Sequence, residues 1–501
     1  MKTETLDVVI IGAGLSGIAA AIHLKKQCPQ KSFTVLEARA GMGGTWDLFQ
    51  YPGIRSDSDM FTLGYRFKPW NKPNAIADGR DIRDYIHDAA SEHQIHPHIR
   101  YQHRVMALDW SSNDAQWTLT VHNNNPEEVL TIKARFVLCC SGYYRYDQGF
   151  TPSFTDQNKF KGQIIHPQFW PQQLDYTNKN IVIIGSGATA VTLIASLSTK
   201  AAKVTMLQRS PGYVMSIPQQ QRLPNRLKTL LPENTAYQLI RARNTLLSMG
   251  FYGFSRKYPQ AARRTLLKQV KKHINSDDTM QHFSPRYNVW DQRLCAVPDG
   301  DLFKALRQGK ANIVTDQIKR FTKTGIELQS GQMLNADIII TATGLNLQIL
   351  GGMQLSVDGQ NVKISEKHYY KGAMLEDVPN LALIFGYTNA SWTLKAELII
   401  SYFCRLINHM DQHDFVQATP RNTDSVQASG SFLDLASGYV QRAIDSLPRQ
   451  GSANPWKMHQ NYFKDYILLK MKKIDDGVLT FSKASQENQS SQHPQALKPA
   501  V

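Results

Sequence analysis

The sequence predicts an α/β protein with two Rossmann-like dinucleotide-binding domains and a helical insertion. Three observations lead to this fold class: a strand–turn–helix pattern with spaced glycines at the N-terminus, a second such pattern beginning at residue 180, and a basic segment after it without strand alternation. A chain of 501 residues is too long for one hydrophobic core and suits two or three domains.

The first unit opens with the apolar segment LDVVIIG, which we expect to form a strand, and continues through GAGLSG into an alanine-rich helix. In this turn Gly12 permits the tight bend, Gly14 lets the backbone approach a pyrophosphate, and Gly17 lets the helix pack on the strand. The next strand ends in Glu37, whose carboxylate can accept hydrogen bonds from a ribose diol and would repel a 2′-phosphate.

The second unit repeats the pattern as NIVIIG, GSGATA, a helix and the strand KVTMLQR, with Gly185 and Gly187 in the turn. Here Gln208 stands where the first unit has its acid, and Arg209 follows it. An arginine at this place can pair with a ribose 2′-phosphate, which favours NADP over NAD, although it could also be a surface residue. Thr189 lies near the helix start, where it either contacts the pyrophosphate or caps the helix.

The basic segment follows, and residues 218–282 look helical. Between residues 214 and 285 there are twelve Lys and Arg against three acids. This charge fits a solvated helical face, and it also fits attraction to an anionic cofactor or a peripheral contact with an acidic membrane surface. Binding of nucleic acid is not expected, because no recognition motif accompanies the charge.

Strand-like segments then return as NIVTD, GIELQS, ADIIITATG and LALIFGY, and a helix is expected near residues 394–410. We therefore assign 1–145 and 345–480 to the first dinucleotide-binding domain and 146–213 and 288–344 to the second. The insertion covers 214–287. The polar, Gln- and Ser-rich residues 483–501 are expected to form a disordered tail.

Composition excludes several classes of protein. Five cysteines without a CxxC motif argue against a disulfide framework, a metal site and a dithiol redox pair, and favour a reducing, cytoplasmic environment. No uncharged run of 18 apolar residues exists, so we expect no integral membrane segment.

Two further segments are unusual. Residues 160–171, FKGQIIHPQFWP, contain Phe160, Gly162, His166, Trp170 and Pro171 at fixed spacing. Five fixed positions at about one in twenty each match by chance at roughly one start site in three million. The residue types alone fit either a packed loop or a linker that hinges two domains. The loop 43–57, GGTWDLFQYPGIRSD, has more glycine and proline than ordinary packing requires, although it could be a surface turn.

These residues resemble the type I Baeyer–Villiger monooxygenases, and among them the ethionamide-activating subgroup. The family pattern FxGxxxHxxxW[P/D] matches residues 160–171, and a second pattern, [A/G]GxWx₄[F/Y]P[G/M]x₃D, matches residues 43–57. The ATG motif of such flavoproteins occurs at residues 342–344, and WDQRLCAVPDGDLF and GYTNASWTLKAEL are also similar to the subgroup. The resemblance extends to about residue 470.

The resemblance implies roles for individual residues. Arg293 would be the active-site arginine and Asp57 the carboxylate that orients it, whereas Asp59 matches no family position. Gly44, Thr45 and Trp46 would bind a cofactor, and residues 160–171 would be a conformational linker. Gln292 departs from the lysine of many members, and Trp392 would either line the pocket or pack in the core.

The resemblance also implies FAD and NADPH as cofactors and O₂ as co-substrate. Hydride from NADPH would reduce FAD, which would take up O₂ as a C4a-peroxide. While deprotonated, this adduct would attack a ketone and yield an ester or lactone; when protonated, it would oxidise a thioether or an amine. The alternatives are a flavin-containing monooxygenase acting chiefly on nitrogen or sulfur, and a flavin-binding redox sensor without catalytic activity.

Overall fold

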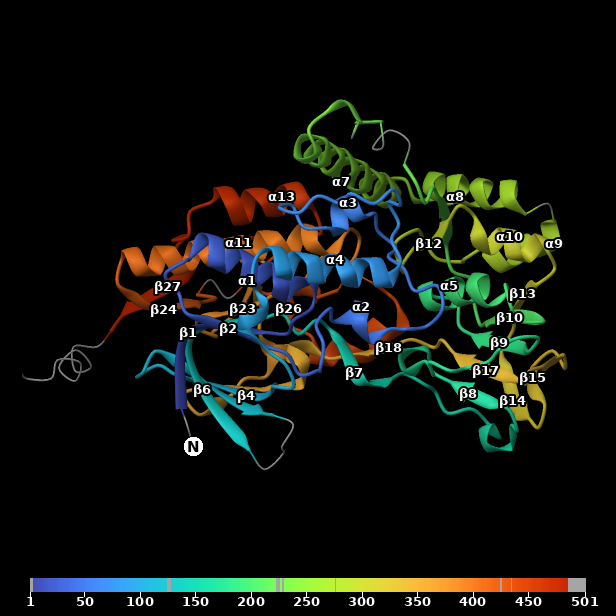
Figure 1. Cartoon of the computed structure of the whole chain (residues 1–501), viewed down its shortest axis with the longest axis horizontal. Coiled ribbons are helices and arrows are strands. Elements are labelled where there is room, and N and C mark those ends of the chain that lie inside the picture. Colours follow the sequence, from blue (N-terminus) through green and yellow to red (C-terminus); the bar gives the residue numbers. More distant parts are fainter. Residues whose placement is uncertain are drawn as a thin grey trace, which may run out of the picture.

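Two separate β-sheets form the framework of the chain. The computed structural model describes residues 3–123, 128–221, 226–227, 229–274, 276–423, 426–433 and 435–484. An 11-stranded sheet forms in the first domain and a 5-stranded sheet in the second, and the two lie at opposite ends of an elongated molecule (Figure 1). The predicted fold class, two Rossmann-like domains with a helical insertion, is confirmed.

The first sheet combines a parallel core with an antiparallel extension. Its parallel strands, in spatial order, are β3 (Ile99–Arg100), β2 (Phe33–Leu36), β1 (Thr3–Ile11), β6 (Val129–Cys139) and β23 (Leu381–Leu383). Beyond β6 the sheet continues through β5 (Gln116–His122), β4 (Arg104–Ser111), β19 (Gln354–Val357) and β20 (Gln360–Asn361). The short strands β21 (Tyr369–Tyr370) and β22 (Met374–Leu375) extend from β23.

Alternating apolar residues hold this sheet between two cores. In β1, Val8 and Ile10 face a core that includes α1 (Leu15–Gln27), α4 (Gly79–Glu92) and α11 (Trp392–Gln412). The intervening Val9 and Ile11 face the opposite core, which also contains residues of β4 and β5. Burial on both faces explains why the strand reads as a continuous apolar run in the sequence.

The second sheet is entirely parallel. Its order is β13 (Ala311–Thr315), β10 (Lys203–Gln208), β9 (Asn180–Ile184), β17 (Ile338–Thr341) and β8 (Gln163–Ile165). Helices α5 (Ala188–Leu197) and α10 (Asp301–Arg307) pack on one face. The other face is covered by the antiparallel strands β14 (Ile318–Thr322), β15 (Gly325–Leu328) and β16 (Met333–Asn335).

The chain crosses between the domains twice at one place. Strand β7 (Tyr144–Gly149) leads out of the first domain, and β18 (Leu345–Leu347) leads back and pairs with it antiparallel. The domain boundaries expected at 145/146 and 344/345 stay a prediction; Arg145 lies within β7, and Leu345 begins β18. Movement of one domain relative to the other would have to bend or shift this pair.

The insertion touches both domains. Its helices are α7 (Glu233–Lys257), α8 (Pro259–His273) and α9 (Asp277–Met280). Helix α7 packs on α3 (Met60–Leu63) of the first domain, whereas α8 packs on β11 (Val214–Ile217). Strand β11 pairs in parallel with β12 (Cys295–Pro298), so the first four residues of the predicted helical insertion are a strand.

The C-terminal part completes the first domain. Its elements are β24 (Phe415–Pro420), β25 (Ala428–Ser431), α12 (Gly438–Ala443), β26 (Arg449–Gly451), α13 (Tyr462–Tyr466) and β27 (Leu479–Lys483). Lys483, which we assigned to the tail, ends β27 opposite Phe415, and the predicted disorder of 485–501 falls outside the described residues. Across the part of the chain that is described, no helix has both the length and the apolar composition needed to cross a bilayer.

Candidate active site between the two domains

A cavity of about 1370 Å³ lies where the carboxyl ends of both parallel sheets meet. Gly12 follows β1, Cys140 follows β6, Gly185 follows β9 and Ala342 follows β17, and all four line the cavity. Ligands of open parallel sheets bind at such carboxyl ends. The two turns identified in the sequence therefore face one common space.

The first glycine turn is packed against its neighbours. A Cβ on Gly12 would lie 2.7 Å from the Cys140 carbonyl oxygen, and one on Gly17 would lie 1.8 Å from the Gly12 carbonyl oxygen. Gly14 lines the cavity. Glu37 also lines the cavity and accepts hydrogen bonds from the backbone N–H groups of Ala13 at 2.7 Å and Arg39 at 2.9 Å. Burial raises the pKa of Glu37, although these two hydrogen bonds oppose the shift.

The second turn leaves more open space. A Cβ on Gly185 would lie 2.3 Å from the Ala342 carbonyl oxygen, whereas one on Gly187 would have no atom within 4 Å. Gly187, Thr189 and Arg209 line the cavity. Helix α5 begins after Gly187, so its unpaired N–H groups are available to an anion there.

Gln208 differs from the expectation that it contacts a cofactor. It is 2% exposed, and its Nε2 donates to the His282 carbonyl and to Thr315 Oγ1. It is the last residue of β10 and does not line the cavity. Its amide instead ties β10 to β13 and to the end of the insertion.

The glycine-rich loop 43–57 closes one side of the cavity. Gly44, Thr45 and Trp46 all line it, and a Cβ on Gly44 would lie 3.0 Å from Gly14 Cα, so this loop packs against the first turn. Asp59, expected to be incidental, accepts the Thr62 N–H at 3.1 Å and so caps α3.

Arg293 and Asp57 meet in the cavity wall. Arg293 Nε lies 3.7 Å from Asp57 Oδ2, and 38% of the arginine side chain is accessible against 16% of the aspartate. Burial alone would lower the pKa of Arg293, but the negative charge of Asp57 raises it above its usual value. Burial raises the pKa of Asp57, and the charges of Arg293 and Arg55 limit that rise. The guanidinium is therefore a permanent cation facing the cavity.

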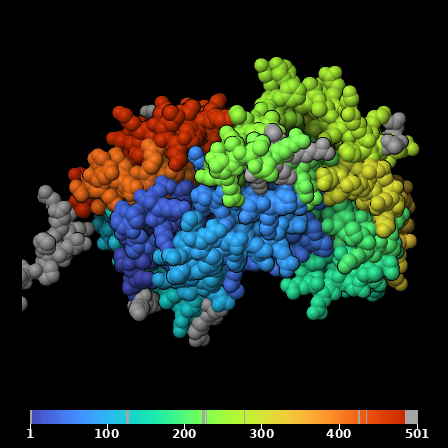
Figure 2. All heavy atoms as spheres, turned by 45° about the horizontal axis from the view of Figure 1, so that its top comes forward, coloured from blue at the N-terminus to red at the C-terminus, as the bar shows by residue number. Residues whose placement is uncertain are grey.

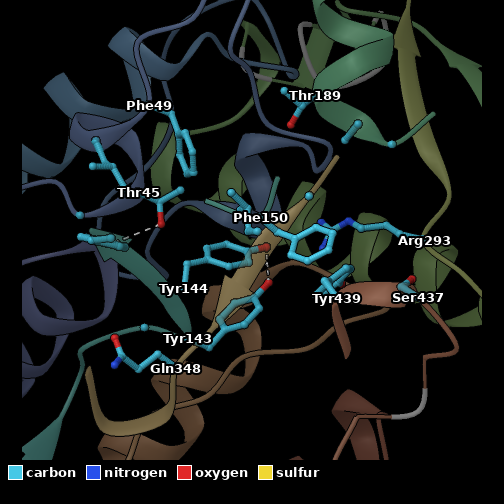
Figure 3. Close-up of a pocket in the computed structure, with 18 of the residues that line it drawn as sticks. Thr45, Phe49, Tyr143, Tyr144, Phe150, Thr189, Arg293, Gln348, Ser437 and Tyr439 are labelled. Atoms are coloured by element: carbon cyan, nitrogen blue, oxygen red, sulfur yellow. Dashed lines mark hydrogen bonds between the residues drawn. The ribbon is translucent and has the colours of Figure 1, made fainter. Parts of the chain in front are cut away.

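Aromatic residues form much of the remaining wall, and sequence reasoning did not find most of them. Figure 3 shows Tyr143, Tyr144, Phe150 and Tyr439 gathered beside Arg293. The Tyr143 and Tyr144 hydroxyl oxygens lie 2.7 Å apart, and the Tyr143 ring stacks on Trp392 with centroids 5.2 Å apart. Burial raises the pKa of Tyr144 well above its usual value, so its hydroxyl stays protonated.

Arg442 is a further cation in the cavity wall. Its guanidinium lies over the Phe150 ring, 3.4 Å from the centroid, and its Nη2 donates to the Leu345 carbonyl at 3.3 Å. Among the described residues no carboxylate is paired with it. The sequence carried no spacing signal for this residue, which comes from α12, far along the chain.

A family comparison decides the class of this chain. The model of the family described as "Flavin-binding monooxygenase-like" matches residues 5–350. The chain belongs to this family.

Curated relatives extend the match over nearly the whole chain. It is 52% identical over 483 residues to "FAD-containing monooxygenase EthA" of Mycolicibacterium smegmatis, covering 96% of this chain and 98% of the relative. It is 50% identical over 486 residues to "Probable FAD-binding monooxygenase AlmA" of an Acinetobacter species, covering 97% and 98%.

Solved structures share the fold at low identity. One described as "Oxidized steroid monooxygenase bound to NADP" superposes with a TM-score of 0.76 at 18% identity, covering 95% of this chain and 99% of that one. A cyclohexanone-bound cyclohexanone monooxygenase superposes with a TM-score of 0.71 at 19% identity, covering 84% and 90%.

The site offers two places where a dinucleotide can bind. Two glycine turns face one cavity from different domains, and Gly187 leaves space at the start of α5. Among the described residues, no group of three or more His, Cys, Asp and Glu is arranged to hold a metal ion. The donor set thus suits pyrophosphates and ribose hydroxyls.

The fingerprint residues 160–171 do not line the cavity, but they pack behind it. Phe160 is buried against Phe321, and a Cβ on Gly162 would lie 2.2 Å from the Asp337 carbonyl oxygen. His166 Nδ1 accepts the Gln168 N–H at 3.2 Å, so the neutral ring carries its proton on Nε2 and donates it to the Gly344 carbonyl, 3.2 Å away. This bond connects the fingerprint to the return strand between the domains.

Proposed function

We propose that this chain is an FAD-containing, NADPH-dependent monooxygenase that inserts one oxygen atom of O₂ into ketones and also oxidises thioethers. The observation that carries the proposal is the Arg293–Asp57 pair facing a cavity into which both glycine turns open. The products would be esters or lactones from ketones and sulfoxides from thioethers.

FAD would occupy the first turn, with Gly12 and Gly14 along its pyrophosphate, Glu37 at its ribose, and the loop of Gly44 to Trp46 near its ring system. NADPH would occupy the second turn at Gly185 and Gly187. The names of the relatives, which describe FAD-containing enzymes, and of a structural neighbour bound to NADP support this pairing of cofactors.

The chain's own residues provide charge, position and exclusion of water. Bound flavin would supply the activation of O₂. Arg293 would hold a fixed positive charge beside negative charge that develops on oxygen, and Asp57 would restrain the direction of the guanidinium. The wall of Tyr143, Tyr144 and Phe150 would keep the site dry and so strengthen this electrostatic effect.

Product analysis tests the reaction. The purified chain with NADPH should convert ketones to products heavier by one oxygen atom, detected by mass spectrometry with labelled O₂. A chain that oxidises amines and thioethers but releases only hydrogen peroxide with every ketone would instead be a nitrogen- or sulfur-oxygenating flavin-containing monooxygenase. Bound flavin without substrate-stimulated NADPH consumption would indicate the redox sensor.

Arg209 is expected to select NADPH over NADH. It lines the cavity directly after β10, where a ribose 2′-phosphate would lie. A charge-assisted hydrogen bond contributes about 1.5–3 kcal/mol, so Arg209→Ala should raise the KM for NADPH about 10- to 100-fold and leave that for NADH nearly unchanged. Lys203→Ala, exposed at the other end of the same strand, is the control. Equal effects on both cofactors would contradict recognition of the 2′-phosphate.

His166 is expected to act as a conformational latch. Burial lowers its pKa, although the hydrogen bond to the Gly344 carbonyl opposes this, so the neutral ring is favoured. His166→Ala should leave the melting temperature and the flavin content close to wild type but raise the hydrogen peroxide released per NADPH about 3- to 10-fold. His96→Ala, on the surface of the first domain, serves as control. An unchanged ratio of hydrogen peroxide released to NADPH consumed would contradict a role of His166 as a latch.

We also place the enzyme in a reducing compartment, the cytoplasm. All five cysteines are free and buried, as suits thiols that are never paired. Thiol titration of protein taken directly from cell fractions checks this, and a disulfide in the native protein would contradict it.

A further inference from the structure

Helix α7 presents an apolar face to solvent. Five of its outward residues, or of those directly after it, are 42–57% exposed: Leu239, Leu246, Leu247, Phe254 and Tyr258. The inward face instead buries polar side chains, among them Arg241, Asn244 and Ser255. A surface helix normally shows the reverse arrangement. We call these five outward residues, with Arg243, Arg256 and Lys257 between them, the α7 outer face.

The charge around this face is mainly positive, although Arg256 Nη1 is paired with Asp291 Oδ1 at 3.1 Å. From residue 233 to 273, the span of α7 and α8, there are nine Lys and Arg and a single acid, Glu233, at the start of α7. Arg243 and Lys257 lie on the α7 outer face itself, and the exposed Lys268, Lys271 and Lys272 lie on α8. Apolar and cationic side chains are thus interleaved on one surface.

A second element adds to the same side of the molecule. Helix α13 and the turn of π-helix after it (Ile467–Met471) expose Phe463, Ile467 and Met471, by 44%, 48% and 69%. Figure 1 places α13 and α7 along the same edge, and Figure 2 shows both the green α7 segment and the red C-terminal segment on the surface turned forward. The charge of Arg241 in α7 acts on Tyr462 at the start of α13, as expected of neighbours.

We propose that the α7 outer face docks on the surface of an anionic lipid bilayer, with α7 lying parallel to the membrane plane. Leucine and phenylalanine side chains would enter the interface by about 5–10 Å, and the interleaved arginines and lysines would meet lipid phosphates. A second copy of the chain would fit less well, because an isologous contact would place these like-charged faces against each other. An anionic bilayer offers both an apolar layer and negative charge.

Vesicle co-sedimentation of the purified full-length chain tests the proposal. The wild type should sediment with vesicles of phosphatidylglycerol and phosphatidylcholine in about equal parts, and much less with phosphatidylcholine alone. Leu246→Ser/Leu247→Ser should lower the partition coefficient at least about 10-fold, since two leucines leave the interface. Arg243→Ala/Lys257→Ala should lower binding to the anionic vesicles about 5- to 30-fold. The matched control is Met106→Ser/Met333→Ser, two exposed methionines elsewhere, which should bind like wild type.

Three results would contradict docking of the α7 outer face on a membrane. Equal sedimentation of the wild type and the Leu246/Leu247 variant would overturn the proposal, as would a wild type that stays in the supernatant. Light scattering that shows a dimer in the wild type and a monomer in that variant, without vesicle binding, would assign the face to a second copy and reject the membrane. NADPH oxidation measured without vesicles should be the same in all these variants, so failure here leaves the proposed reaction untouched.

Discussion

Arg293→Ala is expected to abolish the conversion of ketones to esters while flavin binding and flavin reduction by NADPH remain nearly normal. Arg293 lines the cavity 3.7 Å from Asp57, and within the described part of the chain it forms no hydrogen bond or ion pair with either glycine turn. Removing one fixed charge or donor from a site where charge develops costs about 10²–10³-fold in rate, and we expect at least that loss. Rapid-mixing absorbance of the flavin separates reduction from product formation, which is followed by mass.

Two companion variants sharpen the result. Arg293→Lys keeps the charge but loses the planar fork, so it should retain part of the activity. Asp57→Asn keeps the shape of the partner but removes the charge that raises the pKa of Arg293, and it should lower the rate less than loss of the arginine does. Ester formation by the alanine variant at a rate near wild type would refute the role assigned to Arg293.

The sequence predicted the fold well where long apolar runs mark buried strands. Strands β1 and β9 and the helices after their turns were expected at nearly their observed places, because each carries a strong local pattern. Strand β11 was missed and assigned to the helical insertion. It has four residues, and its partner β12 lies about eighty residues later, so no local signal distinguishes it.

The candidate site was predictable to the extent that its residues form contiguous motifs. The glycine turns and the loop 43–57 could be read directly, and the structure brings Arg293 and Asp57 together, although their roles stay predictions. Tyr439 and Arg442 could not be found, because they reach the cavity from α12, which has no motif.

Gln208 shows a different limit. Successive side chains of a strand point to opposite faces, so the last residue of β10 can be buried while Arg209, the next residue, reaches the cavity. The distance from the glycine turn indicates where the strand ends, but it does not show whether Gln208 or Arg209 faces the cavity.

The second large effect concerns stability. Arg241→Met is expected to destabilise the protein by about 3–5 kcal/mol, because it removes the arginine partner of the buried Glu397 carboxylate and leaves it only the His23 ring and the Arg66 N–H. Arg241 Nη2 lies 2.9 Å from Glu397 Oε2, and its Nη1 donates to the carbonyl oxygens of Phe61, Thr62 and Gly64. The arginine thus joins α7 of the insertion to α11 and to the segment of α3. Differential scanning calorimetry should show an apparent Tm lower by on the order of 5 °C or more.

Matched variants distinguish the buried pair from the helix itself. Arg243→Met, two residues away on the exposed side of α7, should change stability by less than about 0.5 kcal/mol. The double variant Arg241→Met/Glu397→Gln removes both charges and should recover part of the loss. A single variant as stable as wild type, or a double variant worse than the sum of its parts, would contradict the pairing.

The pH dependence gives an independent check with a definite sign. Burial pushes the pKa of Glu397 upward, but the His23 ring, 3.5 Å away, the charge of Arg241 and the Arg66 N–H together hold it below its usual value. A carboxyl whose pKa is depressed on folding stabilises the protein above its unfolded pKa, and this contribution is lost as the pH falls through the folded pKa. Arg241→Met removes the positive charge that lowers the pKa of Glu397. Burial should then raise this pKa, so that the ionised carboxylate destabilises the variant at neutral pH. The difference in Tm between wild type and variant should therefore be largest near neutral pH and shrink towards about pH 4, where protonation removes the unpaired charge. A difference that grows on acidification would show that Arg241 acts through its backbone hydrogen bonds rather than through Glu397.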